Sequence, residues 1–252
     1  MRSVVWLKPD DPFPAEKYWQ GWVVAYGADL SPTRLIDAYR KGIFPWYSEG
    51  EPIRWCSPDP RAVLPTHLLH IPHRLWREWK KKPFYITADT SFQEVIYECA
   101  RTPRKWEDGT WITTDIQQNY IRLHELGYTH SIECWKDKTL VGGLYGVQLG
   151  PLFVGESMFY HTSNASKIAF LALCGFSFLH GIKLIDCQVF SEHLEQFGVF
   201  AVPRKKYLSW LRVNLSENLP TERWQMDMDK VYEAVLYLKK SGSEQSSSKR
   251  DK

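Results

Sequence analysis

Glu156 is the only acidic residue in the apolar, glycine-rich stretch 140–159, which reads LVGGLYGVQLGPLFVGESMF. Burying an isolated carboxylate costs free energy unless the group is paired, hydrogen-bonded or protonated. Glu156 is therefore expected to be either a tethered structural group or a group that takes part in chemistry.

Two further polar side chains alternate along 183–189, KLIDCQV, a segment with the composition of a strand. Because successive side chains of a strand point to opposite faces, Asp186 and Gln188 are expected on one face. Ile185 and Cys187 would then point away. Two interpretations stay open: a satisfied buried hydrogen-bonded pair, or an active pair in which Asp186 orients Gln188 and the Gln188 amide holds an incoming amine or carbonyl.

Three other motifs lack the partners that their chemistry needs. His67, His70 and His73 are spaced by three, but Pro72 interrupts the helix that would align them, and no cysteine or carboxylate completes a metal-ligand set. The run GGLYG has neither the GxGxxG pattern nor the lysine of a phosphate loop. GESMF lacks the GxSxG elbow of a serine nucleophile. No metal is therefore expected.

A basic run at 73–84, HRLWREWKKKPF, interleaves cations with Trp76 and Trp79. This composition suits a surface that grips a phosphate backbone, and a solvated helix face is the alternative. The cations concerned are Arg74, Arg77, Lys80, Lys81 and Lys82.

Composition narrows the class of protein. The 252 residues suffice for one large domain or two small ones, and a net charge of +3 is too mild to indicate nucleic-acid binding by itself. Twelve tryptophans supply flat surface suited to stacking on bases. The five cysteines are widely spaced in apolar contexts, which favours buried, reduced thiols in a cytoplasmic protein. No stretch has the pattern of a targeting signal or a membrane span.

The elements that position these groups can be placed from caps and periodicity. Ser31 and Pro32 predict the start of a helix that Gly42 ends, within a small N-terminal unit. The next stretch is rich in proline and tryptophan, so irregular backbone presenting Trp46 and Trp55 from loops is expected, with a domain boundary near residue 63.

The larger second part is predicted to mix helices and antiparallel strands. Apolar spacing predicts helices at 92–99 and 114–127, the latter capped by Thr114, and a buried helix at 164–181 capped by Asn164. Strands are expected at 131–135, 140–147, 151–154 and 183–189, followed by a short helix at 191–198. The folded core is expected to end close to 207–211.

Several blocks, in order, resemble the bacterial leucyl/phenylalanyl-tRNA-protein transferases. They are GIFPWYSEGEPIRWCSPDPRAVL, GTWIT, LHELGYTHSIECW, LVGGLYGV, FVGESMF, NASK and KLIDCQV, and the resemblance covers about residues 25 to 210. It implies an α+β protein: a small N-terminal domain at 1–63, then a GNAT-type N-acyltransferase domain at 64–235 with a mixed or antiparallel sheet and packed helices. The tail at 236–252 is expected to be disordered. The family is cytoplasmic and uses no metal or nucleotide cofactor.

The resemblance also implies an activity. Leu or Phe would pass from aminoacyl-tRNA to the N-terminal α-amine of proteins beginning with Arg or Lys, creating a degradation signal of the N-end rule. Asp186 would hydrogen-bond Gln188, whose side-chain oxygen receives the attacking amine, and Glu156 would lie beside the acceptor peptide or ester. A monomer is the expected state.

The same resemblance assigns the donor site. Trp46 and Trp111 would sandwich the terminal adenine of the tRNA, and the basic run would grip its acceptor stem. The aminoacyl pocket would be lined by Leu144, Phe153, Met158, Phe170 and Leu173. Leu173 and Ser177 stand where the family often has Phe, which leaves the preference between Leu and Phe open.

Two alternatives remain. An acetyltransferase of the same fold would bind acetyl-CoA through a glycine-rich loop before its central helix, whereas the corresponding stretch here, YHTSNASK, contains no glycine. A noncatalytic RNA-binding adaptor would leave Glu156, Asp186 and Gln188 with structural roles alone.

Overall fold

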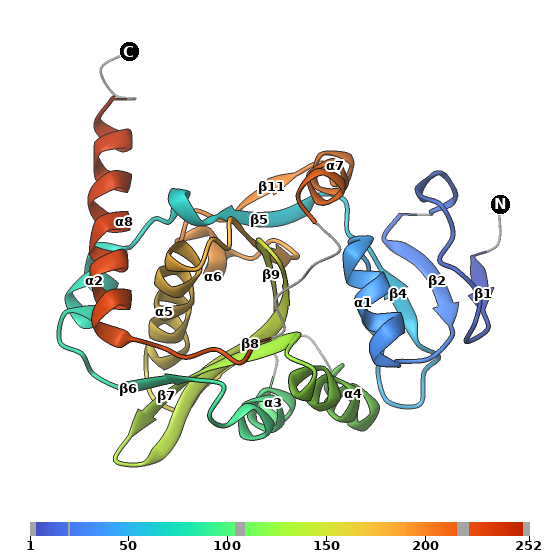
Figure 1. Cartoon of the computed structure of the whole chain (residues 1–252), viewed down its shortest axis with the longest axis horizontal. Coiled ribbons are helices and arrows are strands. Elements are labelled where there is room, and N and C mark those ends of the chain that lie inside the picture. The colour runs from blue at the N-terminus through green and yellow to red at the C-terminus, as the bar shows by residue number, and fades with distance from the viewer. Residues whose placement is uncertain (1–3, 20, 104–108, 216–221, 249–252) are drawn as a thin grey trace.

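The computed structural model describes residues 4–19, 21–103, 109–215 and 222–248, which form two β-sheets flanked by helices (Figure 1). The first elements are β1 (Val5–Leu7), η1 (Glu16–Tyr18), β2 (Val23–Gly27), α1 (Pro32–Arg40), β3 (Phe44–Pro45) and β4 (Arg54–Cys56). The next are β5 (Arg61–Pro65), η2 (Thr66–Leu68), α2 (His73–Trp79), β6 (Tyr85–Ala88), α3 (Phe92–Arg101) and α4 (Thr114–Glu125). The last are β7 (Thr129–Lys136), β8 (Thr139–Leu149), β9 (Leu152–Tyr160), α5 (Ala165–Leu179), β10 (Leu184–Gln188), α6 (Glu192–Glu195), β11 (Phe200–Val202), α7 (Arg204–Asn214) and α8 (Met228–Ser248).

The N-terminal unit is a four-stranded sheet, ordered β1-β2-β4-β3, with α1 beside it. Ser31 caps α1 as predicted, because its Oγ accepts a hydrogen bond from the backbone N–H of Arg34, and Gly42 follows the helix at φ +70°. The expectation that Trp55 is presented from a loop is wrong. Trp55 lies on β4, is fully buried and donates through Nε1 to the carbonyl of Gly27.

The larger sheet has seven strands in the order β11-β5-β10-β9-β8-β7-β6. Its pairings are antiparallel except that between β9 and β10, so the sheet is mixed. The chain leaves β9, forms α5 and returns as β10, which is the right connection length for two parallel neighbours. The predicted strands are confirmed, and the chain passes from the small sheet to the large one between Cys56 and Arg61.

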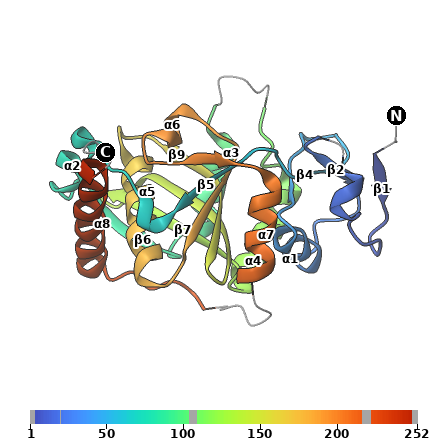
Figure 2. The ribbon, with the colours of Figure 1, turned by 90° about the horizontal axis from the view of Figure 1, so that it is seen from above.

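Helices cover both faces of the large sheet. One apolar cluster joins α3, α4 and one sheet face to the N-terminal unit, and a second joins α2, α5 and α8 to the other face. Figure 2 shows the N-terminal unit at one end of the molecule and α2 with α8 at the other. The buried character predicted for the helix at 164–181 is confirmed, since nearly all of α5 is inaccessible to solvent.

Two predicted caps differ from those observed. The side chain of Thr113, not Thr114, accepts from the N–H of Ile116, so α4 begins at Thr114, one residue earlier than a cap at Thr114 would place it. Asn164 precedes α5 but adopts a left-handed conformation and makes no side-chain capping bond. Asn tolerates that conformation better than most residues, so it turns the chain into the helix without capping it.

Helix α8 corrects the expected tail and the expected end of the core. Residues 236–248 continue a helix, and residues 249–252 lie outside the described residues. Val231, Val235 and Leu238 recur at helical spacing and are buried against α5, where Gly175 lets the two helices approach closely. The polar composition of the last residues concealed this apolar stripe, which begins before position 236.

Candidate active site

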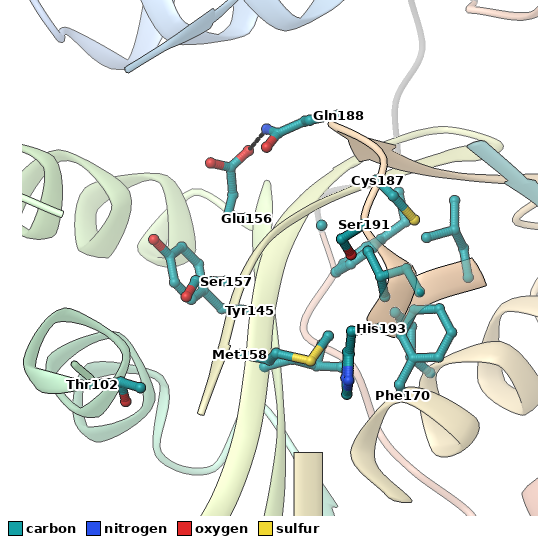
Figure 3. A pocket seen from close by; sticks show the side chains of 16 residues that line it. Thr102, Tyr145, Glu156, Ser157, Met158, Phe170, Cys187, Gln188, Ser191 and His193 are labelled. Carbon is teal, nitrogen blue, oxygen red and sulfur yellow. Dashed lines mark hydrogen bonds between the residues drawn. The ribbon is translucent and has the colours of Figure 1, made fainter. Parts of the chain in front are cut away.

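A cavity of about 300 Å³ opens where β9 and β10 separate (Figure 3). Their parallel pairing covers only Leu152–Val154 and Leu184–Asp186, after which β9 continues to Tyr160. The structure brings together all five side chains predicted for the aminoacyl pocket, and places Glu156 and Gln188 in the same wall. The lining includes Leu144, Phe153, Met158, Phe170 and Leu173, together with Tyr145, Ser157, Ile185, Cys187, Ser191 and His193.

Glu156 reaches this wall because β9 is irregular there. Ser157 pairs with Tyr145 of β8 and Gly155 pairs with Gly146, so Glu156 is an extra residue with no partner across the ladder. Such a bulge re-aims the side chain that it carries and bends the strand. The glycine-rich composition around Glu156 has a steric cause as well, because a Cβ at Gly146 would lie 2.2 Å from the carbonyl oxygen of Val154.

The carboxyl group of Glu156 is buried and only partly satisfied. Its Oε1 accepts hydrogen bonds from the hydroxyl of Tyr39 at 2.7 Å and from Nε2 of Gln188 at 2.9 Å. The Tyr39 hydroxyl is in turn hydrogen-bonded to that of Tyr120. Among the described residues, Oε2 of Glu156 has no hydrogen-bond partner. The group is therefore tethered through one oxygen, and its other oxygen is buried without a hydrogen-bond partner among the described residues.

Burial raises the pKa of Glu156 to about 8, and the nearby charge of Asp186 adds to the shift, while the Tyr39 hydrogen bond and the charge of Arg61 oppose it. Glu156 therefore keeps its proton over most of the neutral range. Since two donors already occupy Oε1, Oε2 is the oxygen left to carry the proton. A carboxyl that exchanges its proton close to neutral pH is suited to general acid–base chemistry.

Gln188 stands at a second bulge, and this overturns the predicted alternation along β10. Asp186 pairs with Val63 and Gln188 with the adjacent Ala62, so two steps on β10 match one on β5. Gln188 adopts a left-handed conformation, at φ +60°. As a result Cys187 and Gln188 both line the cavity, whereas Asp186 does not.

The hydrogen bonds of Gln188 fix the direction of its side chain. Its backbone N–H donates to Oδ1 of Asp186 at 2.8 Å, and its Nε2 donates to Glu156. The predicted contact between Asp186 and Gln188 therefore exists, but it passes through the backbone and not through the side-chain amide. Within the described residues, no hydrogen bond reaches Oε1 of Gln188, which leaves an acceptor at the cavity (Figure 3).

Asp186 is the centre of a separate buried network. Arg61 donates to it through Nε at 2.8 Å and Nη2 at 2.6 Å, and the Tyr207 hydroxyl donates to its Oδ2 at 2.6 Å. Both members of the ion pair are almost completely buried. Burial by itself would lower the pKa of Arg61, but the charge of Asp186 raises it above the ordinary value. Asp186 is thus a fully paired group that holds the Gln188 backbone.

The two tryptophans assigned to the tRNA adenine do not line the cavity. Trp46 follows β3 and is partly buried, and Trp111 is 8% exposed; both belong to the apolar cluster that joins the N-terminal unit to α4. The adenine-binding role of this pair remains a prediction.

The basic run is only partly gathered. Arg74, Arg77 and Lys81 line a polar hollow of about 700 Å³, to which α5 contributes Lys167. Lys82 turns instead to Asp229, at 4.0 Å, and to the face of Tyr232. Lys80 lies over the ring of Trp76 and outside the lining of the hollow.

The remaining features are the cysteines, the possible metal ligands and the apolar helices. Among the described residues the five cysteines form no disulfide bond, and four of them are buried while Cys187 is half-buried. Across the described ranges, the histidines, cysteines and carboxylates form no cluster of three or more that could hold a metal ion. In those same ranges, no helix combines the length and apolar character that a membrane crossing needs.

Sequence reasoning missed the groups that hold Glu156 and Asp186. These are Tyr39, Tyr120, Arg61 and Tyr207. A buried carboxylate signals that some partner must exist, but nothing in the sequence locates one 125 positions away, as Arg61 is from Asp186.

Comparison with known proteins identifies relatives along most of the chain. A family model described as leucyl/phenylalanyl-tRNA protein transferase matches residues 63–212, and one described as the N-terminal domain of that family matches 28–59. The leucyl/phenylalanyl-tRNA--protein transferase of Saccharophagus degradans is 47% identical over 232 residues, 89% of this chain and 95% of that protein. Those of Escherichia fergusonii and Nitratidesulfovibrio vulgaris are 50% and 44% identical, over 80% and 90% of this chain and 85% and 98% of their own. Among solved structures, L-PGS from Bacillus licheniformis aligns with 87% of this chain and 73% of its own at 10% identity, with a TM-score of 0.37.

Proposed function

The chain belongs to the leucyl/phenylalanyl-tRNA protein transferase family, and from that premise we propose that it moves Leu or Phe from aminoacyl-tRNA to a protein N-terminus. We further propose that the acceptor begins with Arg or Lys and that the product is a degradation signal of the N-end rule. The observation that carries the assignment is the cavity itself. Five apolar side chains and the Glu156–Gln188 pair converge there from separate elements.

The cavity supports binding of the aminoacyl side chain. Leu144, Phe153 and Met158 come from β8 and β9, and Phe170 and Leu173 come from α5. An apolar lining of this kind selects Leu and Phe mainly by shape, with a discrimination of about 1 to 3 kcal/mol per methylene. The ester carbonyl would then lie beside Glu156 and Gln188, at the polar end of the lining.

In the reaction, the acceptor α-amine attacks the ester carbonyl carbon, the new amide bond forms, and the ribose oxygen of the tRNA leaves with a proton. Oε1 of Gln188 is the acceptor that positions the amine, and the bond from its Nε2 to Glu156 keeps that oxygen turned to the cavity. A neutral amide is a poor base. We therefore assign proton acceptance to the ionised form of Glu156, which becomes populated as the pH approaches the pKa of about 8.

Asp186 acts at one remove in this scheme. Its Oδ1 accepts from the Gln188 backbone N–H and holds the bulge that aims the Gln188 side chain. Arg61 pairs with Asp186 and holds it in place. Asp186 is thus a positioning residue that acts through the backbone of Gln188.

The donor would be held by two further surfaces. Arg74, Arg77 and Lys81 contribute positive charge to one hollow, which suits sequence-independent contact with the acceptor stem. Trp46 and Trp111 remain our candidates for the terminal adenine, and stacking on Trp111, which is 8% exposed, requires its ring to be uncovered.

We also propose a GNAT-type arrangement for residues 64–235, with residues 1–63 as the small N-terminal domain. The parallel β9–β10 pair joined by the buried helix α5 supports this assignment. A monomer in the cytoplasm, where charged tRNA is made, is the setting we propose.

The donor is the point to test first. The purified protein is given tRNA charged with labelled Phe, or labelled acetyl-CoA, together with a peptide beginning with Arg. Label transferred from tRNA supports the proposal. Label transferred only from acetyl-CoA would replace it with an acetyltransferase, and tRNA binding without transfer from either donor would favour the adaptor.

A further inference from the structure

Phe153 is the side chain on which the depth of the cavity depends. It is fully buried on β9 and lines the cavity. Gly146 of β8 leaves room for its ring, because a Cβ at Gly146 would lie 2.5 Å from Cζ of Phe153. The Phe153 ring therefore fills the space beside Gly146. Whether the ring can shift depends on the residue that packs on its other side.

The residue behind it is Trp224, which comes from the other end of the chain. Trp224 precedes α8, in the segment that runs from the lower end of α8 toward β8 in Figure 1, and it is 7% exposed. Its ring centroid is 5.5 Å from that of Phe153, with 38° between the ring planes. The family match of residues 63–212 ends before this residue.

Four contacts hold Trp224 in one orientation. Its Nε1 donates to Oε1 of Gln148 at 2.8 Å, and its backbone N–H donates to Oδ2 of Asp89 at 2.7 Å. Its ring stacks on His130 at 4.4 Å and 4°, and it packs on Phe176 of α5 at 4.4 Å and 31°. A buried indole ring whose N–H is hydrogen-bonded and which packs on both His130 and Phe176 has little freedom to shift.

We propose that Trp224 is a positioning residue of the aminoacyl site: it backs Phe153 and so sets how large a donor side chain the cavity accepts. The inference rests on the proposed function, because it takes the cavity as the aminoacyl pocket. On this proposal the segment before α8 helps to determine which donor side chain is accepted, although that segment contributes no side chain to the cavity lining.

The physical consequence is a change in selection. Truncating Trp224 leaves a void behind Phe153, and the ring of Phe153 can relax into it. The cavity then deepens on the side of β9. A bulky donor side chain such as Trp gains room, whereas Leu loses contact with the wall. Both effects raise the ratio of Trp transfer to Leu transfer.

The test compares donors that compete in one reaction. Trp224→Ala and the parent protein are each given a mixture of Leu-, Phe- and Trp-charged tRNA with one Arg peptide, and the three products are quantified. Because all donors meet the same molecules, the product ratio does not depend on the fraction of protein that is folded. We expect the Trp-to-Leu ratio of Trp224→Ala to exceed that of the parent by about 10-fold or more.

Two matched variants separate positioning from loosening. Trp224→Phe keeps a ring behind Phe153 but loses the bond to Gln148, so its ratio is expected to stay within about threefold of the parent. Leu238→Ala removes a buried side chain from the same C-terminal segment, on α8, and is expected to leave the ratio unchanged.

A Trp-to-Leu ratio that is the same in Trp224→Ala and the parent would overturn the inference and leave the proposed function intact. An equal shift in Leu238→Ala would also overturn it, because general loosening would then account for the effect. A parent protein that transfers from none of the three charged tRNAs would overturn the proposed function, and with it this inference.

Discussion

Nε2 of Gln188 donates a hydrogen bond of 2.9 Å to Oε1 of Glu156, and each of these two residues stands at a β-bulge. The bulges lie on β9 and β10, the two neighbouring strands whose pairing ends beside the cavity. Regular strands would not bring these side chains to the same wall in this way. The polar end of the site is thus produced by two local departures from strand geometry.

Glu156→Gln should change how stability depends on pH. The folded-state pKa of Glu156 is raised to about 8 from 4.5, so the folded protein binds one more proton than the unfolded chain between those values. The stability of the parent therefore falls as the pH rises through this window, by up to about 1.4 kcal/mol per unit from this group. Glutamine has no such proton.

The measurement is urea unfolding of both proteins from pH 5 to pH 8. The difference in unfolding free energy, variant minus parent, is expected to rise steadily with pH, by on the order of 4 kcal/mol in total. Contributions from all other groups cancel in the difference. A difference that stays constant over this range would show that Glu156 titrates normally.

The Arg61–Asp186 pair should respond to single and double substitution in opposite ways. Asp186→Asn leaves the charge of Arg61 buried without its partner, and Arg61→Met leaves the charge of Asp186 buried without its partner. Each substitution is expected to lower the free energy of unfolding by about 3 to 5 kcal/mol. The double variant removes both charges and should recover part of that loss. Chemical denaturation of the four proteins gives the coupling, and additive losses would contradict the account of a mutually dependent buried pair.

Gly146→Ala should destabilise the protein far more than Gly155→Ala, although the two glycines face each other across β8 and β9. A Cβ at Gly146 would collide with the Val154 carbonyl and the Phe153 ring, whereas one at Gly155 meets nothing closer than 3.7 Å. We expect a loss of about 1 to 3 kcal/mol for the first substitution and less than 1 kcal/mol for the second. Thermal unfolding measures both, and similar losses would be inconsistent with the packing described.

Arg74→Ala combined with Arg77→Ala should weaken tRNA binding in a salt-dependent manner. If each arginine meets one phosphate, the slope of log affinity against log salt concentration falls by about 2 in the double variant. Lys82→Ala is the matched control, because Lys82 is directed to Asp229 and Tyr232 and should change the slope little. Filter binding at several salt concentrations gives the slopes. An equal effect of Lys82→Ala would show that the run acts as diffuse charge.

Local signals were sufficient for most of the individual elements. The cap at Ser31, the apolar spacing of α3 and the continuous apolar surface of α5 each arise within one segment, and each was confirmed. Helix α8 was missed because its stripe ends in a polar sequence. The burial of Trp55 was missed because tryptophans between prolines suit loops as well as short strands.

The site was predictable only in part, for a different reason. The resemblance pointed to Phe153 and Phe170, which the fold does bring into one cavity. The alternation of a strand placed Asp186 and Gln188 on one face of the sheet. The bulge between these two residues breaks that alternation, and no local sequence pattern reveals it. The partners Tyr39 and Arg61 lie more than a hundred positions from the carboxylates that they bind, so only the folded chain identifies them.

In the proposed reaction Gln188 acts on the acceptor amine and not on the donor tRNA. The direct test is Gln188→Ala, with single-turnover transfer of labelled Phe to an Arg peptide measured beside equilibrium binding of the same charged tRNA. We predict that transfer slows by about 100-fold or more while the dissociation constant of the tRNA stays within about twofold. Transfer at the parent rate, or a loss fully explained by weaker tRNA binding, would contradict the account.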